Sequence, residues 1–137
     1  MRKKIIDISE LEQCACFNLR SMAREITNDY NNSLRLKNIN STQIPILAIL
    51  NIYNQIETTK IAKMLNLEVS TLRRNISILM RKKLIKIVKK DVNGNLLSLT
   101  KEGFLKLKET LPIWRKSQKK GKQMVKNYIK TLNQKSN

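Results

Sequence analysis

The feature that most constrains the fold is a change in hydrophobic period after about residue 83. Up to that point apolar residues recur at steps of three and four, which is typical of amphipathic helices. "LIKIVKK" and "NLLSL" then alternate or are apolar over short lengths, with Asn93 and Gly94 between them. Both residues of an Asn-Gly pair accept positive φ, so this pattern predicts a β-hairpin. The helical period returns after Thr100, and the chain is therefore expected to be mainly α, with four helices, a hairpin and two further helices.

Local signals predict where these elements begin and end. An S-x-x-E capping box at Ser9 and Glu12 predicts the start of the first helix. Thr100 is expected to cap the fifth helix, and Pro112 to kink that helix or divide it from a sixth. The four helices before the hairpin are expected at about 9–36, 42–52, 59–66 and 69–83.

Length and hydropathy predict one domain, residues 1–137, in the cytoplasm. The longest apolar run, from Ile44 to Leu50, is far below the roughly 20 residues that span a bilayer. The basic N-terminus lacks the hydrophobic stretch of a signal peptide, so no membrane partner is expected.

The net charge of +18 points to a polyanionic partner. It is concentrated in the second half of the chain, with +6 over residues 67–100 and +9 over 101–137. The first of these segments coincides with a helix and the hairpin, which favours double-stranded DNA as the partner. The lysines of the second segment are expected to form a solvated helix face, with a second DNA site as the alternative.

The residues before the hairpin have the pattern of a helix-turn-helix unit. Leu72, Ile76 and Leu79 share one face of the second helix and should point into the core. Arginine pairs bidentately with guanine, and serine contacts bases or phosphates, so the opposite face suits the major groove. The residues predicted to contact DNA are Ser70, Thr71, Arg73, Arg74, Ser77 and Arg81 on this helix, with Lys89 and Lys90 at the base of the hairpin.

Three stretches resemble one family: "NLRSMAREITNDY", "LNLEVSTLRRNISILMRKKLI" and "LSLTKEGFLKL", the last with Leu-Thr-x-x-Gly at Leu99, Thr100 and Gly103. The chain resembles winged-helix transcriptional regulators of the multiple-antibiotic-resistance regulator (MarR) family. The resemblance implies a homodimer, a helical dimerisation region over 9–40 and 104–135, and a winged helix-turn-helix over 41–103. It also implies a repressor at a pseudopalindromic operator on the nucleoid, with a small-molecule or oxidant effector.

The hairpin departs from the family pattern. Family wings carry arginines that enter the minor groove, whereas the stretch from Asp91 to Asn95 has none. Phosphate contacts by Lys89 and Lys90 are therefore expected instead. An architectural, nucleoid-type DNA binder without a sensing role remains an alternative. No glycine-rich phosphate loop, apolar carboxylate pair or histidine supports an enzyme, and no cofactor is expected.

The only two cysteines, Cys14 and Cys16, are one residue apart. Without histidine they fall short of the four ligands of a zinc site, so no metal is expected. Within one helix they would point about 200° apart, which disfavours a disulfide and leaves packing or reactivity. "LEQCACF" followed by "AREITNDY" resembles the first helix of the hydroperoxide-sensing branch of the family. That resemblance implies a reactive Cys16 and a hydrogen bond from Tyr30 of the other subunit. The chain departs from the branch in two ways: the second tyrosine falls at Ser41, and no C-terminal cysteine exists to resolve a sulfenic acid, which leaves Cys14 of either subunit for that role.

Overall fold

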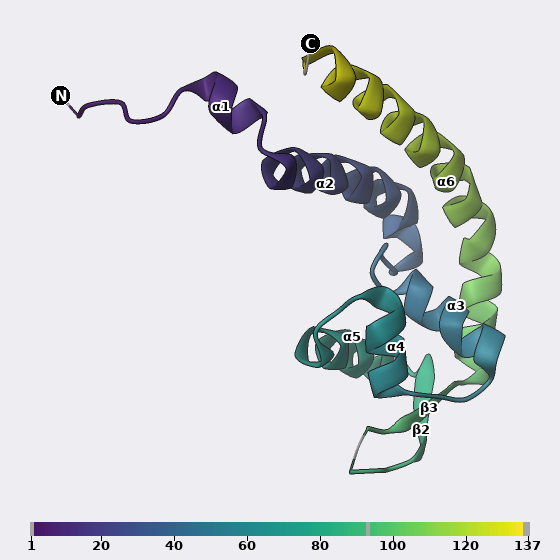
Figure 1. Cartoon of the computed structure of the whole chain (residues 1–137). Coiled ribbons are helices and arrows are strands. Elements are labelled where there is room, and N and C mark those ends of the chain that lie inside the picture. The colour runs from purple at the N-terminus through teal and green to yellow at the C-terminus, as the bar shows by residue number, and fades with distance from the viewer. Residues whose placement is uncertain (1, 93, 136–137) are drawn as a thin grey trace.

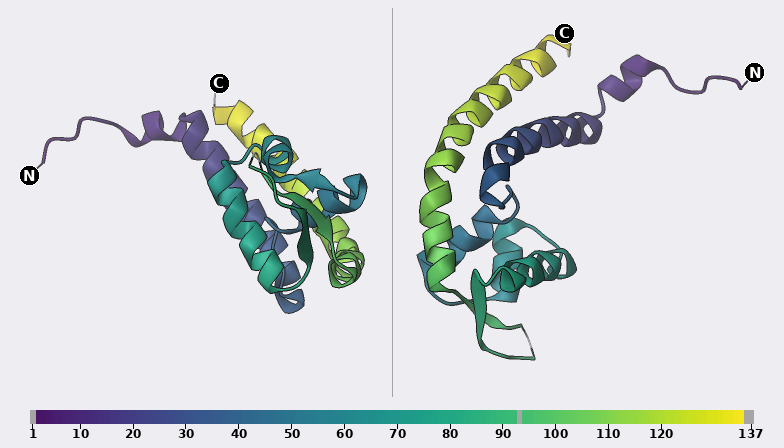
Figure 2. Two further views of the ribbon diagram at one scale, coloured as in Figure 1. Left: turned by 90° about the horizontal axis from the view of Figure 1, so that it is seen from below. Right: turned by 180° about the vertical axis from the view of Figure 1, so that it is seen from behind.

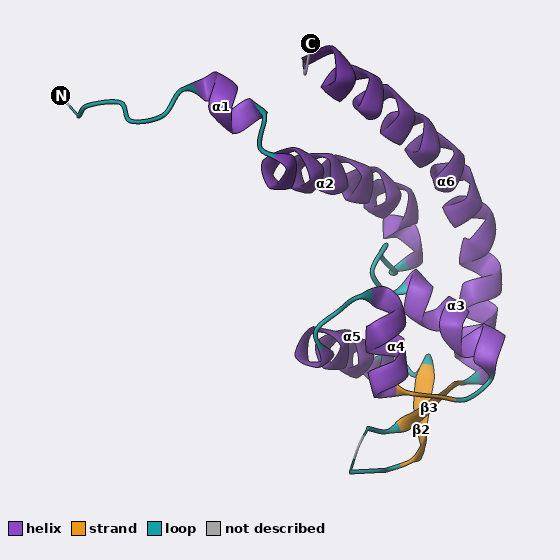
Figure 3. Cartoon of the chain, viewed as in Figure 1, coloured by secondary structure: helices purple, strands orange, loops and turns teal. Residues whose placement is uncertain are grey.

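The computed structural model describes residues 2–92 and 94–135, as six α-helices, one short 3-10 helix and a three-stranded sheet (Figures 1 and 3). None of the helices in these ranges is long and apolar enough to cross a membrane. The elements are α1 Ile8–Glu12, α2 Ala15–Leu34, η1 Arg35–Lys37, α3 Ile44–Tyr53, β1 Ile56–Glu57, α4 Thr58–Leu65, α5 Val69–Arg81, β2 Ile85–Lys89, β3 Leu96–Leu99 and α6 Lys101–Lys135.

The predicted winged helix-turn-helix fold is confirmed: α4 and α5 form the helix pair, and β2 and β3 form the hairpin. The sheet is antiparallel with the order β1-β3-β2, so β3 is central. The strand β1 was not expected, because two residues are too few to show an alternating pattern. It is defined by its pairing, with Ile56 opposite Leu97.

The wing differs in detail from a two-residue hairpin. Residues 90–95 join the strands, and a bulge at Val88 interrupts the β2–β3 register between Ile87 and Lys89. Gly94 has φ +127°, which L-residues rarely adopt, and its N–H donates to the carbonyl of Asp91 at 3.2 Å. The expectation of positive φ at Asn93 falls outside the described residues.

The predicted single helix over 9–36 is wrong in its first part. Asp7, not Ser9, caps α1, since its carboxylate accepts from the N–H of Ser9 at 2.9 Å. The helix ends at Glu12, and α2 starts at Ala15 (Figure 1). The Asn18 amide donates to the carbonyl of Glu12 at 2.7 Å, which satisfies an acceptor left free at the end of α1. Because no residue of α1 is buried, packing does not hold the two segments in one helix.

The predicted cap of the last helix is confirmed, whereas its division is not. The Thr100 hydroxyl accepts from the N–H of Gly103 at 3.0 Å and donates to the carbonyl of Lys83 at 2.6 Å. Pro112 lies inside α6, which continues for 35 residues and curves along its length (Figures 1 and 2). Contacts with the winged domain before Pro112 and with α2 after it maintain the helix despite the lost hydrogen bond.

The hydrophobic core lies among α3, α4, α5 and the sheet. Leu47, Ile61 and Leu97 have no exposed surface, and Leu107 of α6 packs against the same cluster. This core supports α5 from behind. Leu34, the last residue of α2, is buried in the same cluster, and the rest of α2 and the C-terminal half of α6 extend away from it as two long arms (Figure 2).

Candidate nucleic-acid interface

A tight turn fixes the angle between α4 and α5. Asn66 adopts the left-handed conformation with φ 52°, and its N–H donates to the last carbonyls of α4. Leu67 follows with a hydrogen bond to the carbonyl of Ala62 at 2.9 Å, and α5 begins after Glu68. Asparagine tolerates this conformation better than most residues, so the sequence "LNLE" is suited to the turn.

The two faces of α5 are segregated as the sequence predicts. Leu72, Ile76 and Leu79 are buried with at most 6% of their surface exposed. Five of the six predicted contact residues on α5 are exposed, and Thr71 is half-buried. The exposed five are Ser70, Arg73, Arg74, Ser77 and Arg81. The helix therefore presents three guanidinium groups and two hydroxyls on one side, with no described carboxylate in an ion pair with any of them.

The wing is attached to the helix pair at its base. Thr58, the first residue of α4, donates to the carbonyl of Asn95 from its N–H at 3.0 Å and from its hydroxyl at 3.1 Å. The side chains of Lys89 and Lys90 extend from this base and are exposed, and neither forms an ion pair with a described carboxylate. Both predicted wing lysines therefore have ammonium groups without an ion pair to a described carboxylate, and Lys89 is placed by its pairing with Leu96 of β3.

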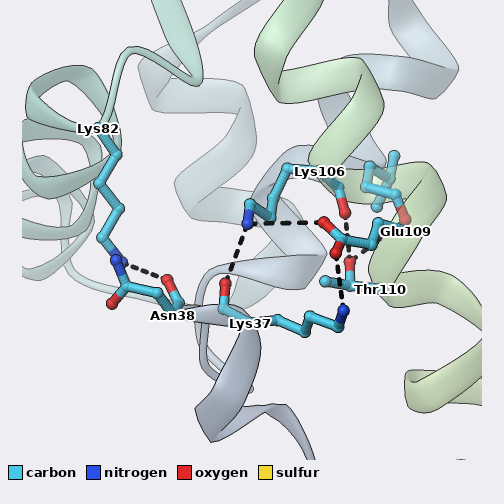
Figure 4. A network of polar contacts seen from close by, with 7 residues as sticks. Lys37, Asn38, Lys82, Lys106, Glu109 and Thr110 are labelled. Carbon is cyan, nitrogen blue, oxygen red and sulfur yellow. Dashed lines mark hydrogen bonds and ion pairs between the residues drawn. The ribbon is translucent and has the colours of Figure 1, made fainter.

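Sequence reasoning missed a polar network that joins α5 to the helical arms (Figure 4). The Lys82 ammonium, just after α5, donates to the carbonyl of Asn38 at 2.7 Å. Lys106 of α6 donates to the carbonyl of Lys37 at 3.1 Å, and Glu109 pairs with Lys37 at 2.8 Å. These residues come from three distant segments, so no local pattern could have identified the network.

The charges of this network alter two pKa values. Partial burial, and secondly the neighbouring Lys106, lower the pKa of Lys82. The hydrogen bond from Lys37 and the charge of that lysine lower the pKa of Glu109, with Lys106 adding to the effect. The network therefore holds the C-terminal end of α5 against η1 and α6. Its three lysines and one glutamate leave it with a net positive charge.

The structure corrects the geometry assumed for the cysteines. Cys14 is not within a helix: it is the N-cap of α2, and its Sγ accepts from the N–H of Phe17 at 3.5 Å. The 200° separation that argued against a disulfide with Cys16 therefore does not apply. Both thiols are exposed, so the packing interpretation fails within one chain.

Tyr30 lies far from Cys16 within the subunit. Both belong to α2, and 14 residues of helix separate them by about 21 Å. The Tyr30 ring packs on Gly121 of α6, where an added Cβ would lie 3.3 Å from the phenolic oxygen. Burial raises the pKa of Tyr30, and the adjacent Asp29 adds to this rise. Among the described residues, no group of three or more histidine, cysteine or acidic side chains could hold a metal ion.

Comparison with known proteins finds similarity at the level of structure. No protein-family model matches the chain, and no curated protein matches it. The transcriptional regulator MosR of M. tuberculosis, solved in complex with DNA, superposes with a TM-score of 0.73 and 26% identity, covering 90% of this chain and 96% of that one.

Two further solved structures share the fold. BpsR of Bordetella bronchiseptica, whose DNA binding is regulated by 6-hydroxynicotinic acid, has a TM-score of 0.71 and 17% identity over 80% of this chain and 81% of that one. A mutant of MarR from E. coli complexed with operator DNA has a TM-score of 0.69 and 18% identity over 84% and 85% of the two chains. These relatives are transcriptional regulators and not enzymes, which agrees with the sequence-based expectation. The winged fold and these similarities show that the chain has the fold of the MarR-family winged-helix transcriptional regulators.

Proposed function

We propose that this protein binds double-stranded DNA by placing α5 in the major groove and thereby regulates transcription. The observation that supports it most directly is the exposed face of α5, where arginines and serines lie opposite a fully packed apolar face. MosR, which has the same fold, was solved in complex with DNA.

The side chains of α5 and the wing would have different roles. Arg73 and Arg74, near the middle of the exposed face, would contact bases or phosphates. Ser70, Thr71 and Ser77 would add shorter contacts, and Arg81 would bind phosphate near the end of the helix. Lys89 and Lys90 would neutralise phosphates beside the groove, because the described wing residues include no arginine.

A homodimer would place two copies of α5 on one operator. The helical arms leave large apolar side chains uncovered: Phe17 and Leu19 of α2 are 43% and 55% exposed, and Phe104 and Ile129 of α6 are 48% and 50% exposed. Exposed apolar groups at this density are typical of a protein interface. Residues 9–40 and 104–135 would then form the dimerisation region and 41–103 the DNA-binding unit. Sedimentation equilibrium should give twice the chain mass, and a folded monomer at micromolar concentration would refute the dimer.

Selection of bound duplexes from a random pool tests the DNA-binding proposal. We expect a pseudopalindrome whose half-sites are about one helical turn apart. Arg73→Ala or Arg74→Ala should relax the preference at one position by about 1–3 kcal/mol. Lys89→Ala should weaken binding to all DNA sequences equally and reduce the slope of log affinity against log salt concentration by about one unit.

The matched control for these substitutions is Arg24→Ala, which removes the same charge from an exposed site on α2. It should leave both preference and salt slope nearly unchanged. If both α5 variants keep the operator preference, α5 is not the recognition helix. Binding without any sequence preference would instead favour the architectural alternative.

We also propose that oxidation of a cysteine thiol regulates DNA binding. Both cysteines are exposed, so a peroxide can reach either one. Oxidation of Cys16 would shift the arms and release DNA, with Tyr30 of the second subunit and Cys14 assisting. Operator binding after cumene hydroperoxide treatment, compared with Cys16→Ser and Cys14→Ser, tests it. Unchanged binding by a wild-type protein shown by mass spectrometry to be oxidised at Cys16 would refute it.

A further inference from the structure

The C-terminal half of α6 carries a row of cations that binding through α5 does not use. Arg115, Lys119, Lys122, Lys126 and Lys130 follow one another at steps of four, three, four and four residues. At 100° per residue these steps place all five on one face of the helix. All five side chains are exposed. We call this row the basic ridge.

No acidic side chain neutralises the basic ridge. The sequence contains no aspartate or glutamate after Glu109, and none of the five cations forms an ion pair with a described carboxylate. The one ion pair on this half of α6 joins Lys120 to Asp29 at 2.6 Å, and Lys120 lies off the ridge. The ridge therefore keeps its full charge and lacks an intramolecular partner.

The ridge points away from the rest of the subunit. The opposite face of α6 packs on α2: Ser117 is 4% exposed, Gly121 lies against Tyr30, and the Tyr128 hydroxyl donates to the carbonyl of Asn18 at 2.8 Å. Of the side chains proposed for the dimer, Phe17 and Leu19 belong to α2, and Ile129 lies about 60° from the middle of the ridge at 100° per residue.

The ridge is also distant from the recognition helix. Gly103 marks where α6 touches the winged domain, and the ridge begins 12 residues later and ends 27 residues later, about 18 to 40 Å along the axis. Figures 1 and 2 show this half of α6 at the opposite end of the molecule from α5 and the wing. A straight DNA segment held by α5 therefore does not lie along the ridge.

We propose that the basic ridge binds the phosphate backbone of a second double-stranded DNA segment, so that the protein bridges two duplexes. Five positive charges along about 22 Å of helix face a polymer with one negative charge per about 1.7 Å of axis. The ridge contains no aromatic side chain on which the bases of a single strand could stack. The face of α6 opposite the ridge is packed on α2, so that face is not free to insert into a lipid surface.

Two-duplex capture tests the proposal. One duplex of random sequence is attached to beads, protein is added, and retention of a second, fluorescent duplex is measured at about 0.1 M salt, where charges interact over about 10 Å. The variant Lys119→Gln/Lys122→Gln/Lys126→Gln should retain at least about ten-fold less second duplex than wild type. Its affinity for a single operator should change little, and the salt slope of bridging should fall by about 2.7.

The control is Lys116→Gln/Lys120→Gln/Lys135→Gln, which removes the same charge from other faces of α6. It should bridge like the wild type. The proposal is wrong if both triple variants bridge equally well, or if anionic vesicles or single-stranded RNA displace the duplex at a lower phosphate concentration than unlabelled duplex does. The bridging proposal rests on the proposed α5 site, and an Arg73→Ala/Arg74→Ala variant separates the two proposals. If this variant loses operator preference while the ridge still binds a duplex, both proposals are supported.

Discussion

Gly103 is where the structure predicts the largest effect of a single methyl group. A Cβ added there would lie 1.9 Å from the carbonyl oxygen of Leu84 and 2.9 Å from its carbonyl carbon. These are backbone atoms and cannot rotate away, and the same oxygen accepts a hydrogen bond from the N–H of Thr100 at 3.1 Å. Gly103→Ala must therefore push the start of α6 away from the end of α5 and the hairpin.

The size of the effect follows from two opposing terms. Alanine is the better helix former by about 1 kcal/mol, which favours the variant. Overpacking costs typically about 1–3 kcal/mol, and occasionally more when the obstacle is rigid. Because the shortest contact is more than about 1 Å too close, we expect a loss above that range and a net destabilisation of about 2–3 kcal/mol. For a chain of this length that lowers Tm by roughly 8–10 °C.

Urea unfolding followed by circular dichroism, at one fixed protomer concentration, measures this loss. Gly121→Ala is the matched control in the same helix. Its Cβ would lie 3.2 Å from the edge of the Tyr30 ring, a side chain that can shift, so its stability should stay within about 1 kcal/mol of wild type. Equal stability of the two variants would refute the steric argument.

Three further predictions concern other sites at the ends of helices and in the polar network. Thr100→Val should destabilise by about 1–2 kcal/mol in urea unfolding, because the hydroxyl that caps Gly103 and donates to Lys83 is lost. Lys83→Gly should stabilise by about 0.5–1 kcal/mol in the same assay, since Lys83 is held at φ 60°. The lowered pKa of Glu109 means that its pairing with Lys37 stabilises the fold above the ordinary glutamate pKa and is lost as pH falls through the folded value. Below the ordinary glutamate pKa of 4.5, the loss of unfolding free energy with falling pH should therefore be steeper in wild type than in Glu109→Gln.

The elements that the sequence predicted correctly are those whose signal is local and repeated. Leu72, Ile76 and Leu79 recur with the helical period, and all three are buried. The same periodicity predicted which side of α5 is exposed, and the Asn-Gly pair predicted the wing. Thr100 was recognisable as a cap because a hydroxyl residue precedes a new helical period. These features depend on neighbours within a few residues, which a single sequence contains.

The features that the sequence did not predict depend on distant partners or on competing local signals. The strand β1 exists through its pairing with β3. At the N-terminus, Asp7 and Ser9 are both good caps, and periodicity continued across Gln13, so a break between Glu12 and Ala15 had no clear signal. The contacts of Lys82 and Lys106 with backbone carbonyls near η1 depend on the tertiary fold.

The Leu99-Thr100-x-x-Gly103 motif shows why a family resemblance indicates the fold more firmly than it indicates the ligand. Thr100 joins the start of α6 to Lys83, just beyond α5, and Gly103 permits α6 to approach the carbonyl of Leu84 closely. The motif therefore sets the direction in which the long helix leaves the winged domain, and it contacts no proposed DNA. Any chain with this junction can be expected to fold in this way, whatever sequence it binds. Under the proposed function, specificity would come from the exposed side chains of α5, which the packing of the fold does not constrain.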